Sequence, residues 1–188
     1  KGLRNVLVTS GYIETEPLLE LAKWTDAAHV DLKGFEESTY LKLNGGSLQP
    51  VLDALIALRK AGVWTEIINL IVPTYTDKPE TIKRMCGWIV EKLGPDQPVH
   101  FSRYHPAHKL RLPPTPTDIL ETARATARAA GLRYVYIGNV PGLKNAGVTT
   151  CPRCGKVVVD RDVYSVRAVE IADGKCRYCG EKIAGVWK

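Results

Sequence analysis

The chain of 188 residues is 45% hydrophobic and 24% charged, an ordinary globular composition that excludes a disordered protein. No run approaches the roughly 18 consecutive apolar residues of a membrane span, and no basic-then-apolar leader is present, so we expect a soluble, cytoplasmic protein. A formal net charge of +6 is compatible with anionic ligands, but no concentrated basic run demands nucleic acid.

The beginning of the chain is unusual. The first residue is Lys1, the only methionine is Met85, and the apolar run Val6-Leu7-Val8 follows almost at once. A native start normally shows a methionine and some lead-in. We therefore expect a piece of a longer protein, with N-terminal trimming as the alternative.

Short β-branched runs alternate with segments of helical period, which is typical of βα units and a parallel sheet. The predicted strands span residues 5–9, 28–32, 65–72, 99–103 and 134–137. The predicted helices span residues 17–24, 50–61, 78–93 and 117–130. Five strands are too few for a closed eight-stranded barrel. We therefore expect an α/β protein, with a partial barrel or an open sheet.

The helix over residues 78–93 has the clearest pattern, because its apolar residues form one continuous stripe. Cys86 lies within that stripe and is predicted to be a buried structural thiol. After Gly138 the alternation stops, and Asn145-Ala146-Gly147 is typical of a linker. We expect a barrel part over residues 1–145 and a small cysteine-bearing domain over residues 146–188.

Four cysteines form the most specific local motif. Cys151-Pro-Arg-Cys154-Gly and Cys176-Arg-Tyr-Cys179-Gly are two Cys-x-x-Cys-Gly knuckles. Together they supply four thiolates, which suits tetrahedral zinc and equally a single iron. Two disulfides or a redox dithiol are the alternatives, but disulfides lack a secretory context. Val157-Val158-Val159 and residues 164–169, separated by Asp160-Arg161-Asp162, are predicted to form a hairpin between the knuckles.

Such a tail allows two further functions. It can be a metal-ribbon module that binds nucleic acid or protein without redox catalysis. Lys and Arg side chains spread along it favour nucleic acid, although no aromatic ladder for stacking bases accompanies them. It can also serve stability alone.

The carboxyl ends of parallel strands are where ligands bind in α/β folds. Asp31 and Lys33 flank Leu32 at one such end and share a face because strands have period two. The pair can hold both ends of a zwitterion, or it can be a plain salt bridge at a barrel rim. His105, in a turn at the same edge, is a ligand contact or proton donor rather than a metal ligand.

Several segments together resemble the radical S-adenosylmethionine (SAM) enzymes related to pyruvate formate-lyase activating enzyme. Residues 5–12 resemble their strand four, Asp31-Leu32-Lys33 their strand five, and Leu70-Ile71-Val72-Pro73 the end of strand six. More distinctive segments lie at residues 100–110, 113–116, 136–142 and 185–187. With the two knuckles, these resemble the AmmeMemoRadiSam-system branch of that family.

The resemblance implies a partial (β/α) barrel of TIM type, of which this chain keeps strands four to six and a C-terminal extension, with a rubredoxin-like zinc-ribbon tail. It also implies a [4Fe–4S] cluster held by an upstream Cys-x3-Cys-x2-Cys loop. There, one electron cleaves SAM to a 5′-deoxyadenosyl radical, which abstracts hydrogen, in the activating enzymes from a glycine of a partner protein. A reductant such as flavodoxin or ferredoxin is implied as well.

Carried over by residue, Thr9, Ser10 and Gly11 are expected to line the methionine pocket of SAM. Asp31 and Lys33 are expected to hold its amino-acid end, and His105 its nucleoside. The tail metal, Zn or Fe, is expected on Cys151, Cys154, Cys176 and Cys179.

The sequence departs from the activating enzyme at three positions. Val8 replaces an aspartate, which argues against a cation site of the activase type; Ser10 replaces an asparagine, and Thr74 replaces a glycine that usually follows the proline. None of the five cysteines has the cluster spacing. This segment alone is therefore expected to be inactive.

Overall fold

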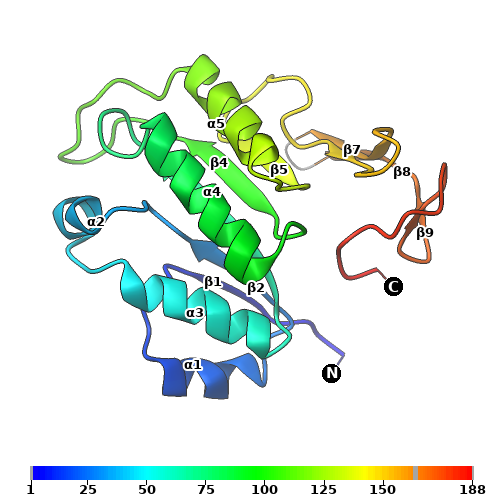
Figure 1. The fold of residues 1–188 in the computed structure, drawn as a ribbon, viewed down its shortest axis with the longest axis horizontal. Coiled ribbons are helices and arrows are strands. Elements are labelled where there is room, and N and C mark those ends of the chain that lie inside the picture. The colour runs from blue at the N-terminus through cyan, green and yellow to red at the C-terminus, as the bar shows by residue number, and fades with distance from the viewer. Residues whose placement is uncertain (1, 163–164, 188) are drawn as a thin grey trace.

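A computed structural model describes residues 2–162 and 165–187 of the chain. Five strands form one parallel sheet in the order β1-β2-β3-β4-β5 (Figure 1). Their bounds are β1 Val6–Thr9, β2 Ala27–Asp31, β3 Trp64–Ile71, β4 Val99–Arg103 and β5 Val135–Gly138. All five lie within two residues of the predicted positions, because β-branched runs mark buried parallel strands well.

The described helices are α1 Thr15–Ala22, α2 Glu37–Asn44, α3 Gln49–Lys60, α4 Pro79–Leu93 and α5 Thr117–Ala129. Apart from α2, which lies beside the sheet, the helices cover one of its faces (Figure 1). The apolar stripe of α4 packs into the main core, where Cys86 is fully buried as predicted. Burial raises the pKa of the Cys86 thiol to about 12, so that this thiol stays neutral and inert.

Helix α2 was not predicted. Its only buried residue is Tyr40, so the apolar stripe that signals a helix is missing from its sequence. It ends at Gly45, which takes up the left-handed conformation with a φ of 67°. The tertiary setting, rather than local pattern, therefore places this helix.

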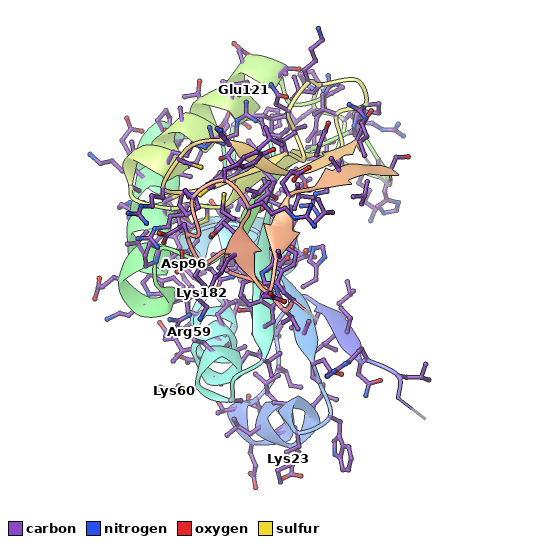
Figure 2. All side chains as sticks on the ribbon, turned by 90° about the vertical axis from the view of Figure 1, so that its right-hand side faces the viewer. Lys23, Arg59, Lys60, Asp96, Glu121 and Lys182 are labelled. Atoms are coloured by element: carbon purple, nitrogen blue, oxygen red, sulfur yellow. The ribbon has the colours of Figure 1, made fainter. Side chains whose placement is uncertain are left out.

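The opposite face of the sheet is open. Along β3 the side chains alternate regularly, so that Thr65, Ile67, Asn69 and Ile71 are buried and the residues between them are partly exposed. Figure 2 shows the helices to one side of the sheet. A sheet covered on one face only is consistent with the partial barrel, whose strands turn this face inward.

The resemblance implied three barrel strands followed by an extension. In the structure, β4 pairs with β3 and β5 pairs with β4, both in parallel, so all five strands predicted within residues 1–145 belong to one sheet. The sheet therefore contains two strands beyond the three that the resemblance named, as the alternation of strands and helices predicted.

The residues after β5 form a small unit of short strands. These are β6 Thr149–Thr150, β7 Val157–Asp162, β8 Ser165–Val169, β9 Ile171–Ala172 and β10 Lys175–Cys176. The predicted hairpin is present, since β7 and β8 pair antiparallel. Asp160-Arg161-Asp162 belongs to β7 rather than separating the strands, and Tyr164 lies outside the described residues. The Asp and Arg residues suggested a turn because polarity is a weak signal where both strand faces are partly exposed.

The tail packs against the last strand of the sheet. Tyr134 and Tyr136 share a second apolar cluster with Cys151, Val158 and Ile183. The Tyr134 hydroxyl accepts a hydrogen bond from the Ala184 N–H at 3.1 Å, and the Tyr136 and Thr149 hydroxyls are 2.9 Å apart. Barrel and tail are therefore joined by a common core. None of the described helices has the length and hydropathy needed to cross a membrane.

Candidate functional site

The four tail cysteines converge on one point. The Sγ atoms of Cys151 and Cys179 are 3.6 Å apart, and those of Cys154 and Cys176 are 3.8 Å apart. All four ligand atoms lie within 4.8 Å of one another. Metal–sulfur bonds of about 2.3 Å in a tetrahedron require sulfurs roughly 3.8 Å apart. The four cysteines therefore fit a tetrahedral metal ion, as predicted, and the four sulfur donors suit zinc or iron.

The two knuckles have the same backbone geometry. The Cys151 N–H donates to the Lys156 carbonyl at 2.8 Å, and the Cys176 N–H donates to the Glu181 carbonyl at the same distance. Gly155 and Gly180 follow the second cysteine of each pair with φ values of 71° and 74°. Only glycine adopts this conformation without strain, so it lets each loop turn its two thiols inward.

The strand-end turn after β1 is held by its own side chain. The Gly11 N–H donates to Thr9 Oγ1 at 3.0 Å, and Gly11 has a φ of 69°. Thr9 pairs with buried Val30, so its side chain lies on the helix-covered side of the sheet. Val8, which is 73% exposed, takes the position on the open face. The sequence did not reveal this division of faces.

Asp31 and Lys33 form an ion pair where β2 ends. Lys33 Nζ is 2.9 Å from Asp31 Oδ2, and the two side chains are 39% and 33% exposed. The Lys33 N–H donates to the Tyr40 hydroxyl at 3.0 Å. Burial raises the pKa of Tyr40 to about 12, so the phenol stays neutral beside the pair. The predicted pair is thus assembled and remains accessible from solvent.

Two polar residues behind this rim were missed. Buried Asn69 donates from Nδ2 to the Leu32 carbonyl at 2.7 Å, and its Oδ1 has no partner among the described residues. The Thr76 hydroxyl accepts from the Val72 N–H at 2.7 Å and donates to the Leu70 carbonyl at 3.0 Å. Both residues tie strand ends to loops, and such contacts between distant segments leave no local sequence signal.

The backbone at Thr74 has the conformation that suits the glycine expected there from the resemblance. It has a φ of 69°, in the left-handed region that a β-branched residue rarely adopts. The backbone after β3 therefore keeps the turn, at a cost of about 1 kcal/mol or more in strain.

His105 lies further along the same edge. Its Nε2 is 3.3 Å from the Asn139 carbonyl oxygen, in the loop after β5. It follows β4, whereas Asp31 ends β2, so two inter-strand spacings of roughly 10 Å in all separate the two strand ends. The structure therefore places His105 on the predicted edge but not against the ion pair.

A row of polar side chains crosses the open face. His100 Nε2 and Glu66 Oε2 are 2.7 Å apart, and His29 Nε2 is 3.9 Å from Asp31 Oδ1. The hydrogen bond with His100 lowers the pKa of Glu66, although partial burial opposes the shift. Desolvation lowers the pKa of His29. This row was also missed, because it depends on strand register.

The Glu66 contact predicts acid sensitivity. A carboxylate with a lowered pKa in the folded state stabilises the protein above its ordinary pKa of 4.5, and this stabilisation is lost as the pH falls. We expect Glu66→Gln to flatten the fall in unfolding free energy between about pH 6 and about pH 3, measured by urea denaturation. Glu121→Gln, which removes a carboxylate paired with Arg124 on α5, is the control for loss of a carboxylate elsewhere in the protein. Equal slopes in all three proteins would contradict the role of the His100 contact.

No protein-family model matches the chain. It is 42% identical over 185 residues to an uncharacterised protein of Methanocaldococcus jannaschii, covering 97% of this chain and 54% of that protein. It is 29% identical over 105 residues to a pyruvate formate-lyase-activating enzyme of Clostridium pasteurianum, covering 56% of this chain and 43% of that enzyme. The chain thus spans about half the length of the curated relatives that it matches.

Two solved structures share the fold. A domain of a pyruvate-formate lyase-activating enzyme from Bacteroides vulgatus aligns with a TM-score of 0.63 at 15% identity, covering 73% of this chain and 83% of that one. A radical SAM methyltransferase from Sphaerobacter thermophilus aligns with a TM-score of 0.57 at 14% identity, covering 81% and 43%. The chain therefore has the partial α/β barrel fold of radical SAM proteins and is related in sequence to pyruvate formate-lyase-activating enzyme.

Proposed function

We propose that this chain forms the SAM-binding part of a radical SAM enzyme. The observation that carries the proposal is the solvent-accessible Asp31–Lys33 ion pair at the carboxyl end of a parallel strand, within a fold shared with radical SAM proteins. Ligands of parallel α/β sheets bind at this edge.

The ion pair has the chemistry to hold the amino-acid end of SAM. The Lys33 ammonium binds the methionine carboxylate, and the Asp31 carboxylate binds the methionine ammonium. The two groups already lie 2.9 Å apart. On binding, the ligand therefore replaces the one contact between Lys33 and Asp31 with two contacts, one from each side chain to the ligand. Buried Leu32 between them, held through its carbonyl by Asn69, keeps the two side chains in place.

The turn after β1 contributes shape rather than charge. The Thr9 hydroxyl holds the Gly11 N–H, and this fixes the turn. Ser10 and Gly11 then line the methionine pocket, while His105 contacts the nucleoside part from the end of β4, the next strand but one from the ion pair on β2. When bound, a [4Fe–4S] cluster supplies one-electron cleavage of SAM. Its ligands are expected outside these residues, because none of the five cysteines has the Cys-x3-Cys-x2-Cys spacing.

The tail cysteines are assigned a different task. They bind a structural Zn or Fe ion that holds the tail against β5. The proposal has three further parts. The electron comes from a reductant such as flavodoxin or ferredoxin, and the substrate is a glycyl-radical protein or another protein. The chain belongs to the AmmeMemoRadiSam-system branch. The coding DNA upstream of Lys1 offers a direct check, since a Cys-x3-Cys-x2-Cys about three βα units earlier is expected. A start codon just before Lys1 would instead favour a binding module without redox chemistry.

Substitution of Lys33 tests the site. In protein that includes the cluster-binding segment, Lys33→Ala should weaken SAM binding by about tenfold or more, because a charge-assisted hydrogen bond contributes about 1.5–3 kcal/mol. Calorimetric titration with SAM and anaerobic assay of 5′-deoxyadenosine measure the effect. Lys23→Ala, which removes a lysine paired with Glu20 at the C-terminal end of α1 (Figure 2), should change neither. Unchanged SAM affinity in Lys33→Ala would rule out the assigned role.

A further inference from the structure

A cavity of about 800 Å³ lies between the barrel and the tail. The loop that follows β5 forms one wall, and β7 and β8 of the tail form another. Its volume falls within the range of roughly 300–1,000 Å³ that small-molecule sites occupy. Neither the SAM-binding residues nor the four cysteines line it.

Arg161 on β7 is fixed within this cavity. Its Nε–H donates to the Gly147 carbonyl at 2.8 Å, and its guanidinium lies over the Tyr136 ring, 5.0 Å from the centroid. Tyr136 in turn stacks on His100, with ring centroids 4.8 Å apart. The two terminal guanidinium nitrogens make no hydrogen bond or ion pair with any residue among 2–162 and 165–187. A planar guanidinium that is fixed in place and has both terminal nitrogens available is suited to bidentate binding of a carboxylate or phosphate.

The surrounding charges favour a carboxylate. Arg167 pairs with two nearby acids, at 2.9 Å from Asp162 and 3.9 Å from Asp160, and offsets one of their two negative charges. Glu66 is a third acid, close enough that Arg161 contributes to its lowered pKa. Lys144 also lines the cavity and has no ion pair within the described part of the chain. The acids remain close, however, so a dianionic phosphate meets more repulsion here than a singly charged carboxylate.

Apolar side chains from the end of β5 and the following loop also line the cavity. Ile137, Val140 and Leu143 line it and also pack against the main core. A ligand that fills the cavity therefore meets apolar side chains as well as charged ones, and an apolar body beside a charged end matches both.

We propose that this cavity binds an organic carboxylate with an apolar body, held by Arg161. The tail is part of the site, because Arg161 belongs to β7, and β7 pairs with β6 directly before Cys151. The metal-binding tail thus builds one wall of a ligand site in addition to stabilising the fold. This proposal is independent of SAM binding.

Binding of 2-naphthoate tests the site, with neutral 2-naphthamide as the matched probe of apolar burial. We expect naphthoate to bind the 188-residue chain at least about tenfold more tightly than naphthamide, and Arg161→Gln to abolish this preference. Arg161→Lys keeps the charge without the fork and should bind naphthoate more weakly than the wild type. Arg153→Gln, which changes a tail arginine near Glu181 outside the cavity, should behave as the wild type.

Three results would overturn the proposal: no naphthoate binding, equal affinity for the two probes, or full preference retained in Arg161→Gln. Inorganic phosphate is the competing anion. If phosphate displaces naphthoate at a phosphate concentration below that of naphthoate, the cavity is a phosphate site instead. If Arg161→Gln does not fold, as seen by circular dichroism, the two probes on the unsubstituted chain still decide. The assay needs neither SAM nor a cluster, so its failure leaves the proposed function standing.

Discussion

Cys154→Ser should release about one metal equivalent per chain and unfold the tail. Three sulfurs cannot complete the tetrahedron, and the small cluster of Tyr134, Tyr136 and Val158 has little other support. We expect the unfolding free energy of the tail to fall by more than about 4 kcal/mol, because loss of a metal is among the largest effects of a single substitution. The five-stranded sheet should persist, since its core is separate.

Elemental analysis of the purified protein measures the metal content. Limited proteolysis measures unfolding of the tail, through the rate of cleavage at sites beyond residue 146. Cys86→Ala is the matched control, because it removes the one cysteine that lies outside the cluster. It should lower stability through a core cavity while keeping the metal. Full metal content in Cys154→Ser, or metal loss in Cys86→Ala, would remove the assignment of the four cysteines.

Gly11→Ala should destabilise the barrel part by about 2–5 kcal/mol. The substitution places a Cβ 2.9 Å from Val30 Cγ1 and 3.3 Å from Val51 Cγ1, at a φ of 69°. The left-handed conformation costs an L residue about 1–2 kcal/mol, and overpacking adds about 1–3 kcal/mol. Urea denaturation followed by far-ultraviolet circular dichroism measures the loss.

Gly45→Ala separates the two causes. Gly45 has nearly the same φ, 67°, but a Cβ there meets nothing within 4 Å. It should therefore show the backbone cost alone, about 1–2 kcal/mol. Equal losses of unfolding free energy in the two variants would mean that β2 and α3 can move away from a Cβ at residue 11 without cost. The turn would then be a less rigid wall for a ligand than proposed.

Local patterns predicted the five strands of the parallel sheet, four of the five helices and the cluster of four cysteines that could hold a metal ion. Each depends on residues close in sequence: β-branched runs, the stripe on α4, and two Cys-x-x-Cys-Gly knuckles whose glycines adopt positive φ. The Asp31–Lys33 pair was also predicted, because residues two apart on a strand share a face. Helix α2 was missed, since only Tyr40 is buried on it.

The sequence by itself determined the βα alternation, the tetrahedral cysteine site and the ion pair at the end of β2, because each follows from periodicity or short spacing. Only the tertiary structure decided which residues cross the open face and which meet between barrel and tail. Glu66 meets His100 because β3 and β4 pair in one register, although 34 residues separate them. Arg161 reaches Tyr136 because the tail packs on β5. A shift of one residue in the pairing of β3 with β4 would turn Glu66 to the opposite face from His100. The packing of the tail on β5 joins segments far apart in the sequence, and no short motif predicts it.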